Sequence, residues 1–310
     1  MAKEMRAVFS EKLLSLMEKN ENIVVIDADL ARANGTLGIR AVYPERAFDV
    51  GVAEANMASV AAGMAACGFI PFIGTFTPFA SRRICDQITI SICYAGRNVK
   101  IVGSDPGVTA EYNGGTHMSV EDIGVLRSIP NLVIFEPVDA TQFAQALEAI
   151  TDYEGPVYIR MFRKEAEDVF GPGYRFDLFK ADTVKEGKDV SIFASGFMVQ
   201  QSVKAVQALG ALGIDAELIN IHTIKPIDRQ AVIASAKKTG AVVTCDNHNI
   251  IGGLGSAVAE VLAEECPTKM RRVGIQDRFG EVGKLNYLCE AMKLRPEDIV
   301  QAVQDLLGRA

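Results

Sequence analysis

Short apolar runs that alternate with segments of helical periodicity constrain the fold of this chain more than any other feature. The runs predict buried strands at Ile23–Ile26, Phe48–Val50, Phe69–Gly74, Val99–Gly103, Leu132–Phe135 and Val157–Met161, and again at Val190–Ala194, Ala216–Ile221, Ala241–Cys245 and Arg272–Ile275. This alternation is typical of a doubly wound α/β fold with mostly parallel sheets.

The segments between the runs predict helices. A first helix is marked by the i, i+3, i+4 spacing of Met5, Val8, Phe9, Leu13 and Met17. Further helices are expected at Met57–Cys67, Phe79–Tyr94, Glu121–Ile129 and Ala140–Ile150, and then at Val199–Leu209, Arg229–Lys237, Leu254–Ala263 and Pro296–Leu307. The periodicity fades in the charged, glycine-containing stretch before residue 188. We therefore expect one α/β domain at residues 1–165, a linker at 166–187 and a smaller α/β domain at 188–310.

Composition excludes several classes of partner. The net charge of −7 comes from scattered acids, whereas nucleic-acid binding needs a clustered basic face. No run of apolar residues is long enough to predict a membrane span, and the N-terminal segment is too charged for a signal peptide. The six cysteines lack a CxxC pair, which favours reduced thiols and a cytoplasmic protein.

Glu54 is the most informative single residue. It lies in the stretch DVGVAEANM, between a predicted strand and a helix of small residues. An acidic side chain at a helix N-terminus stabilises the helix dipole and needs no ligand. A carboxylate with apolar neighbours is also suited to hydrogen-bond a bound molecule, so its neighbours in the fold decide between the two interpretations.

Several loops that follow predicted strands carry candidate site residues. Asp29, Glu54, the pair Phe76 and Phe79, and His117 would meet at one sheet edge, where open α/β folds bind their ligands. Each also has a simpler interpretation: the aspartate as a loop cap, the phenylalanines as core and the histidine as a turn residue.

As a set, these residues suit a heteroaromatic ring that stacks on an aromatic side chain while a carboxylate holds one ring nitrogen. The aminopyrimidine of thiamine is such a ring. Its hydrogen bond to a carboxylate favours the imino tautomer, which removes the thiazolium proton.

The order of the motifs resembles one family. The stretches DVGVAEANM, GFIPFIGTFTPFASRRICDQ, EYNGGTHMSVEDIGVLRSIPNLVIFEPVDA and GPVYIRMFRK are similar to the pyrimidine-binding domain of transketolases and deoxyxylulose-phosphate synthases. The later stretches DVSIFASG, INIHTIKPID and DNHNIIGGLGSAVAE resemble the C-terminal domain that both share. The resemblance covers nearly the whole chain.

The resemblance implies roles for the cofactor-site residues. Glu54 matches the glutamate that activates the pyrimidine ring, and Phe79 matches the aromatic residue that stacks on it. Phe76 matches an aromatic residue that lines the pocket, and Asp29 matches an aspartate near the thiazolium.

It also implies substrate contacts. His117 matches an active-site histidine that contacts the hydroxyl or carbonyl oxygens of the sugar. Arg163 matches an arginine that reaches the phosphate of the acceptor sugar, and Arg6 is a second candidate for that contact.

This sequence departs from the family at three substrate positions. Asn113 stands where the family has an aspartate that binds a substrate hydroxyl. Asp105 stands where many transketolases have a phosphate-binding histidine, and Ala33 where they have a phosphate-binding serine. A carboxylate at Asp105 repels a phosphate dianion. Either Arg163 and other cations hold the phosphate in a rearranged way, which we favour, or the acceptor is not a standard pentose phosphate.

The motif that holds the diphosphate in this family is absent. Its Mg²⁺ is ligated by a GDG…N motif, and this sequence contains no Asp-Gly dipeptide. The run Gly252–Gly255 resembles a phosphate loop, but close packing between a strand and a helix explains it better. The resemblance therefore implies the C-terminal section of a transketolase split over two polypeptides, with the Mg²⁺ ligands on the partner chain.

The implied function is transfer of a two-carbon ketol unit from a ketose phosphate to an aldose phosphate, as in the pentose phosphate pathway, with thiamine diphosphate. The implied assembly is an α₂β₂ heterotetramer, in which pyrimidine-binding domains pair through small-residue helices. Two alternatives remain: the β subunit of a 2-oxo-acid dehydrogenase, and a catalytically idle regulatory or scaffold subunit. A deoxyxylulose-phosphate synthase is disfavoured because that family keeps both halves in one chain.

Overall fold

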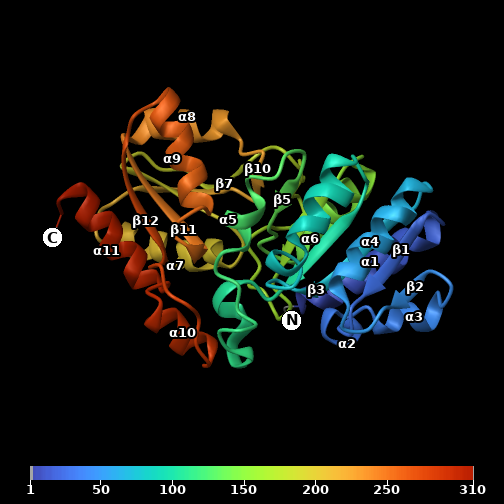
Figure 1. Cartoon of the computed structure of the whole chain (residues 1–310). Coiled ribbons are helices and arrows are strands. Elements are labelled where there is room, and N and C mark those ends of the chain that lie inside the picture. Colours follow the sequence, from blue (N-terminus) through green and yellow to red (C-terminus); the bar gives the residue numbers. More distant parts are fainter. Residues whose placement is uncertain (1–2, 310) are drawn as a thin grey trace. The chain divides into compact units, whose positions relative to one another are not determined.

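A computed structural model describes residues 3–309, which form two compact units (Figure 1). The first unit contains the chain up to Pro106 together with Val125–Leu178. The second contains Gly107–Gly124 together with the chain from Phe179 onward. The change of unit at Leu178 falls within the predicted linker, and the segment 107–124 groups with the second unit although it lies early in the sequence.

The first unit is built on a parallel sheet. Its strands are β1 (Ile23–Asp27), β2 (Ala47–Asp49), β3 (Ile70–Phe76), β4 (Lys100–Ser104), β5 (Val133–Phe135) and β6 (Val157–Met161). They lie in the order β5-β6-β4-β3-β1-β2, and every neighbouring pair is parallel. The carboxyl ends of these strands therefore share one edge, which confirms the fold class predicted from the apolar runs.

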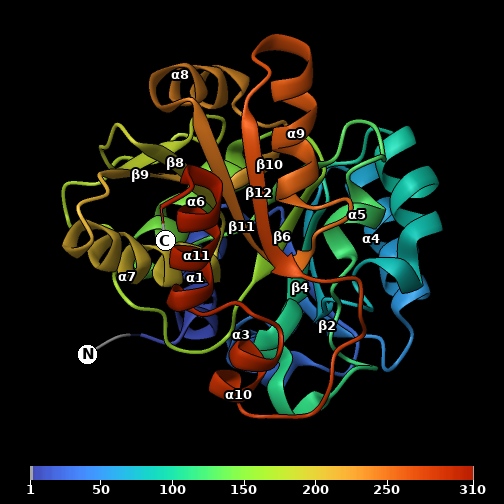
Figure 2. The ribbon, with the colours of Figure 1, turned by 90° about the vertical axis from the view of Figure 1, so that its left-hand side faces the viewer.

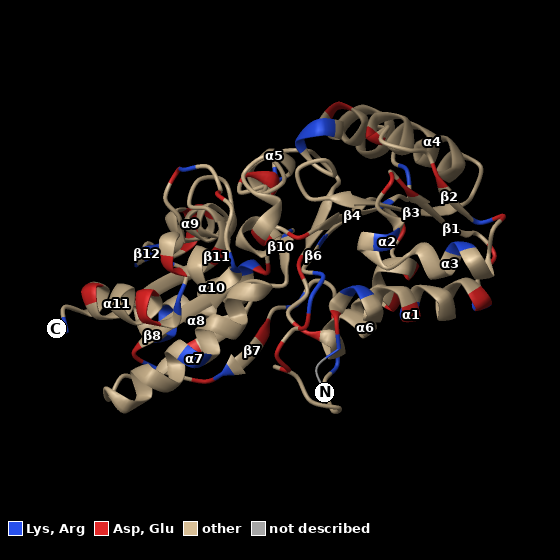
Figure 3. Cartoon of the chain, turned by 90° about the horizontal axis from the view of Figure 1, so that it is seen from below, with Lys and Arg blue, Asp and Glu red and all other residues tan. Residues whose placement is uncertain are grey.

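Helices cover both faces of this sheet. They are α1 (Met5–Lys19), α2 (Ala31–Asn34), α3 (Leu37–Val42), α4 (Glu54–Ala66) and α6 (Ala140–Asp152), with a 3₁₀ helix η1 (Arg82–Ile84) and a π-helix η2 (Gln87–Tyr94). Figure 3 shows α4 on one side of the strands and α1 with α6 on the other, and it shows charges of both signs interspersed. The short helix α5 (Asp122–Leu126) spans the change of unit after Gly124.

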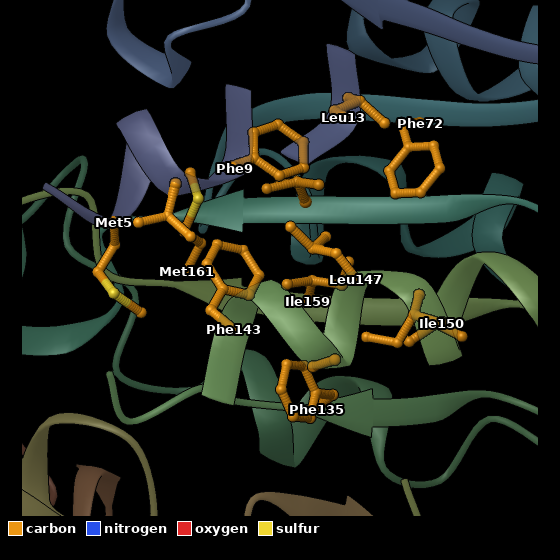
Figure 4. Close-up of a cluster of buried hydrophobic side chains, with 14 of the residues drawn as sticks. Met5, Phe9, Leu13, Phe72, Phe135, Phe143, Leu147, Ile150, Ile159 and Met161 are labelled. Atoms are coloured by element: carbon orange, nitrogen blue, oxygen red, sulfur yellow. The ribbon is translucent and has the colours of Figure 1, made fainter. Parts of the chain in front are cut away.

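The main core of the first unit lies between the sheet and the pair α1 and α6 (Figure 4). Phe9 of α1 stacks on Phe143 of α6, with ring centroids 6.1 Å apart, and it also contacts Phe72 of β3. The apolar residues that mark α1 in the sequence are all buried here. Burial of such side chains contributes about 1.5–3 kcal/mol each relative to exposure.

The predicted helix Phe79–Tyr94 was wrong as a single α-helix. The chain instead forms a 3₁₀ turn at η1 that passes through α-helical Cys85 and Asp86 into the π-helix η2. The stretch from Ile88 to Ile92 is rich in β-branched residues, which lose side-chain freedom in an α-helix and weaken its preference for the regular form. The wider coil of η2 still buries Ile88 and Ile92.

The second unit has its own sheet. Its strands are β7 (Asp182–Lys185), β8 (Val190–Ala194), β9 (Ala216–Asn220), β11 (Ala241–Asn249) and β12 (Lys269–Ile275), in the order β12-β11-β8-β9-β7. All neighbouring pairs are parallel except β7 with β9. The remaining elements are η3 (Gly107–Asn113), β10 (Thr223–Lys225), α7 (Phe197–Ala211), α8 (Arg229–Thr239), α9 (Leu254–Glu265), α10 (Leu285–Ala291) and α11 (Pro296–Leu307). Figure 2 shows α9 beside β11 and β12.

The glycine run at the start of α9 lets the loop pack closely against side chains of β11, as predicted for it. The Leu254 N–H donates to Asp246 Oδ2 at 2.7 Å, so an internal carboxylate already meets the start of the helix. A Cβ added at Gly253 would lie 2.7 Å from Nδ1 of the buried His248. Glycine is required because the loop passes so near these two side chains.

Within residues 3–309, no helix is both long enough and apolar enough to cross a membrane.

A buried ion pair links β6 to the end of β5. Arg160 is 0% exposed, and its Nη1 donates to Glu136 Oε1 at 2.7 Å. Removing one partner of such a pair leaves an uncompensated buried charge.

We expect Glu136→Gln to lower the free energy of unfolding by about 3–5 kcal/mol, measured by urea denaturation. Glu11→Gln, in an exposed pair with Lys3, is the matched control and should change it by less than about 1 kcal/mol. Equal effects of the two substitutions would contradict this prediction.

Candidate active site

The candidate site lies at the carboxyl edge of the first unit's sheet. Asp29 follows β1, Glu54 follows β2, Phe76 ends β3, Asp105 follows β4 and Arg163 follows β6. Because these strands are parallel neighbours, residues distant in sequence reach the same edge. Asp29, Glu54 and Phe76 follow or end neighbouring strands as the order of the loops predicts, whereas His117 lies in the segment that groups with the second unit.

Glu54 is the first residue of α4 and is 5% exposed. The helix places it there because Met57, Ala58 and Ala61 bury one face of α4. Its Oε1 accepts a hydrogen bond from Arg83 Nη1 at 2.6 Å. A carboxylate in the first turn also complements the helix dipole. The structure therefore combines both interpretations: Glu54 stabilises a helix start and is a buried carboxylate with one charged partner.

Phe76 and Phe79 lie next to each other, each half-buried. Their ring centroids are 6.4 Å apart and their planes are inclined by 60°. Each ring also meets an arginine: the Arg83 guanidinium lies 3.7 Å from the centroid of Phe79, and that of Arg163 lies 5.0 Å from the centroid of Phe76. Such cation–π contacts orient the planar guanidinium over the ring. Arg83 thus connects the ring of Phe79 to Glu54, and Phe76 adjoins Phe79.

Asp105 and Arg163 form a tight ion pair. Arg163 Nε donates to Asp105 Oδ2 at 2.6 Å, its Nη2 contacts the same carboxylate, and its backbone N–H donates to Oδ1 at 3.2 Å. Asp105 is 1% exposed and has a positive φ of 54°. Burial raises the pKa of Asp105, and the hydrogen bond and charge of Arg163 oppose that rise. The arginine predicted to reach a phosphate is therefore already bound to a carboxylate.

Asp27 is a buried carboxylate at the end of β1. It accepts hydrogen bonds from Thr36 Oγ1 at 2.6 Å and from Asn34 Nδ2 at 3.3 Å. Burial raises its pKa to about 6, and these two hydrogen bonds counteract part of that rise. The polar cluster ties α2 and the start of α3 to the sheet edge.

Asp29 differs from Asp27 in its surroundings. It is exposed, has a φ of 60°, and its backbone N–H donates to Asp49 Oδ1 at 3.0 Å. This backbone conformation is uncommon for a residue with a side chain. This residue forms part of the turn between β1 and α2. Its assignment to the cofactor site stays a prediction.

Arg6 and Ala33 lie near Arg163. The Arg6 backbone N–H donates to the Arg163 carbonyl at 3.1 Å, while its guanidinium pairs with Glu4 at 2.8 Å. The Ala33 carbonyl accepts from Arg163 Nη1 at 3.4 Å. The backbone of Arg6 therefore lies next to that of Arg163 at the sheet edge. The charge of its side chain is partly balanced by Glu4.

Asn113 and His117 belong to the segment that groups with the second unit. Asn113 is exposed at the end of η3. His117 is half-buried; its Nδ1 lies 2.9 Å from Thr116 Oγ1, and its backbone N–H donates to the Gly114 carbonyl at 3.0 Å. The turn expected from the two glycines is present, and the substrate roles of both residues stay predictions.

Arg83 was missed by the sequence reasoning. It lies four residues after Phe79, a spacing that brings side chains together on a helical segment. That spacing was the available signal, but two adjacent arginines in a predicted amphipathic helix are usually solvent-exposed. The long-range pairing with Glu54 is what makes Arg83 part of the candidate site.

In the described chain, 3–309, no group of three or more His, Cys, Asp or Glu side chains is arranged to hold a metal ion.

The fold and the sheet edge define a class of protein: a subunit of the enzymes that use thiamine diphosphate. Residues 1–168 match the family model of the transketolase pyrimidine-binding domain, and residues 179–299 match that of the transketolase C-terminal domain. The chain belongs to the transketolase family and corresponds to the C-terminal section of a split transketolase.

Relatives of similar length support this assignment. The chain is 51% identical to the 6-deoxy-6-sulfo-D-fructose transketolase subunit SqwH of Clostridium sp. (strain MSTE9), over 98% of this chain and 95% of that protein. It is 35% identical to one of the subunits of an apulose-4-phosphate transketolase from Phocaeicola vulgatus, over 88% of this chain and 87% of that protein. A solved split-gene transketolase, described as an inactive beta4 tetramer, superimposes with a TM-score of 0.92 at 42% identity, over 98% of both chains.

The raised pKa of Asp27 predicts a pH dependence of stability. A carboxyl with a pKa of about 6 in the folded state and 3.8 in the unfolded state binds more protons when folded, so its contribution to stability is lost as pH rises from about 4 to above 6. The asparagine in the Asp27→Asn variant does not titrate, so the variant does not lose this stability as pH rises. We expect the free energy of unfolding of the variant, relative to wild type, to rise by up to about 3 kcal/mol between pH 4 and pH 8.

Urea denaturation at a series of pH values measures this difference. Thr36→Val removes the shortest hydrogen bond to the carboxylate, a bond that lowers the pKa of Asp27. The free energy of unfolding of this variant should therefore fall more steeply with rising pH than that of wild type. If the free energies of unfolding of Asp27→Asn and wild type differ by the same amount at every pH in this range, the pKa of Asp27 is not raised in the folded state.

Proposed function

We propose that this chain is the pyrimidine-binding subunit of a two-chain transketolase that transfers a two-carbon ketol unit from a ketose phosphate to an aldose phosphate. The observation that carries the proposal is the buried carboxylate of Glu54 beside the ring of Phe79, in a chain that spans both family domains. Retention of these residues argues against an idle scaffold subunit.

The residues present fit an aminopyrimidine ring. Glu54 is buried enough to prefer a specific hydrogen-bond partner over water, and Phe79 offers a flat face within reach of the same partner. When bound, thiamine diphosphate would supply the nucleophilic chemistry that ketol transfer between sugars needs. This chain would hold the pyrimidine end through Glu54 and Phe79, with Phe76 and Asp29 lining the site.

The proposal requires a partner that carries the diphosphate and Mg²⁺ ligands. We propose an N-terminal transketolase section as that partner, in an α₂β₂ assembly. Pairing of two pyrimidine-binding domains is supported by apolar side chains exposed on adjoining elements: Val60 on α4, and Ile90 and Tyr94 on η2. Tyr94 is 84% exposed, and together with Val60 and Ile90 it offers apolar surface that a second chain could cover.

The substrate end of the site supports two candidates. In the first, the acceptor or donor sugar carries a phosphate that Arg163 binds, with help from Arg6, and Asn113 and His117 contact its oxygens. Asp105 opposes this, because an extra negative charge about 4 Å from a carboxylate costs on the order of 1–4 kcal/mol.

In the second candidate, the terminal group is a sulfonate, which carries one negative charge where a phosphate carries nearly two. The ion pair of Arg163 with Asp105 favours this alternative, because Asp105 offsets the charge of Arg163 and its carboxylate repels a monoanion less than a dianion. The 51% identical relative is named for a 6-deoxy-6-sulfo-D-fructose substrate.

Glu54 tests the proposed function. In the enzyme reconstituted with its partner chain, Glu54→Gln should lower the rate of ketol transfer by about 100-fold or more, because the pyrimidine loses the carboxylate that assists its proton transfer. Glu45→Gln, an exposed acid before β2, should retain full activity. Ketol transfer is followed by coupled assay of the aldose product. Undiminished turnover of Glu54→Gln would leave the scaffold interpretation.

Asp105 separates the two substrate candidates. Under the second candidate, the wild-type enzyme should show a higher kcat/KM with a sulfonated donor than with a phosphorylated one. Asp105→Asn should then shift the preference towards phosphorylated sugars by about tenfold, because no carboxylate offsets the charge of Arg163. The measurement compares kcat/KM for matched phosphate and sulfonate sugars. A wild-type preference for phosphate that Asp105→Asn leaves unchanged would exclude the sulfonate candidate.

A further inference from the structure

Arg83 connects the two side chains on which the proposed function depends. Its Nη1 lies 2.6 Å from Glu54 Oε1, and its guanidinium carbon lies 3.7 Å from the centroid of the Phe79 ring. Glu54 is 5% exposed, whereas the side chain of Arg83 is 44% exposed. The buried carboxylate is therefore covered from the solvent side by an arginine.

The local backbone explains this position. Arg83 lies in η1, four residues after Phe79, and its backbone N–H is 3.4 Å from the Pro78 carbonyl. This helical spacing brings the arginine side chain back over the ring that precedes it. The irregular η1, in place of the expected α-helix, holds the guanidinium between the ring and the start of α4.

A guanidinium shares two recognition properties with an aminopyrimidine. Both are planar groups whose in-plane N–H donors pair with a carboxylate while one face stacks on an aromatic ring. Arg83 uses Glu54 and Phe79 in both ways. The ring face and the carboxylate oxygen that Arg83 contacts are the partners that the function proposed above assigns to the aminopyrimidine.

We propose that Arg83 is an additional residue of the cofactor site, whose guanidinium occupies the position of the aminopyrimidine ring and has to move outward before the ring binds. The exposed side of Arg83 gives it a path into solvent without unfolding η1 or α4. While it is in place, Arg83 balances the charge of the buried Glu54, which would otherwise lack an ionic partner.

The consequence is a competition within the site. Cofactor binding breaks the contacts of Arg83 with Glu54 and Phe79, so part of the ring's affinity is used to displace it. A variant without the guanidinium no longer has to break these contacts, and it should bind the cofactor more tightly and faster. A residue that only stabilised the site would have the opposite effect when removed.

The test measures cofactor binding by the chain reconstituted with its diphosphate-binding partner. Thiamine diphosphate and Mg²⁺ are titrated by calorimetry, and association is followed by stopped flow. Arg83→Met should lower the Kd about tenfold and speed association, since it removes one ion pair and one cation–π contact. Arg83→Lys keeps the charge but loses the flat stacking, so it should give a smaller decrease in Kd. Lys19→Gln, which makes the same change in net charge at the end of α1, should bind as wild type.

Circular dichroism and unfolding midpoints verify that each variant is folded. If Arg83→Met does not fold, Arg83→Lys decides, and binding no tighter than wild type by that variant overturns the proposal. Unchanged or weaker binding by a folded Arg83→Met, with ketol transfer still slowed in Glu54→Gln, overturns the role of Arg83 and leaves the proposed function intact. Failure of the unsubstituted pair to bind thiamine diphosphate would overturn the proposed function, and this proposal with it.

Discussion

Parallel hydrogen bonding in the first sheet is the constraint on which the candidate site depends. Each strand from β1 to β6 pairs in parallel with its neighbours, so the chain leaves every strand at the same edge. Residues far apart in sequence are adjacent there because of this topology and not because of any local signal. A single antiparallel strand among them would send its following loop, with its side chains, to the opposite edge.

Much of the fold could be predicted from sequence because both faces of the sheets are buried. A strand covered on both sides is buried along its whole length and is mostly apolar, as in β1 and β6, and such runs are visible without knowledge of their partners. The elements that were missed have other causes. The short helices α2 and α3 are joined to the sheet by the hydrogen bonds of Asp27 with Asn34 and Thr36, and these depend on tertiary contact.

Several members of the candidate site could be proposed from the sequence, but Arg83 and the pairing of the side chains could not. Glu54, Phe79, Asp105 and Arg163 could be proposed from motif order, but the partner of each depends on contacts that sequence spacing does not encode. Arg83 reaches Glu54 across 29 positions, and Arg163 reaches Asp105 across 58. This pairing changes the chemistry that follows, because an arginine bound to a buried carboxylate is a weaker attractant for a dianion than an isolated one.

The same arrangement occurs twice at this edge: an arginine pairs with a buried carboxylate and lies over a phenylalanine ring. Arg83 does so with Glu54 and Phe79, and Arg163 with Asp105 and Phe76. In each trio the charges of the carboxylate and the arginine balance. A ligand binds favourably at either place only if it interacts with the carboxylate, the arginine or the ring more strongly than the present partner does. At Glu54 that partner would be a flat cationic or N–H-donating ring. At Arg163 it would be an anion whose attraction to the guanidinium exceeds its repulsion by Asp105. In the proposed function, selectivity at this edge would therefore depend on exchange of partners within existing ion pairs more than on the net charge of the site.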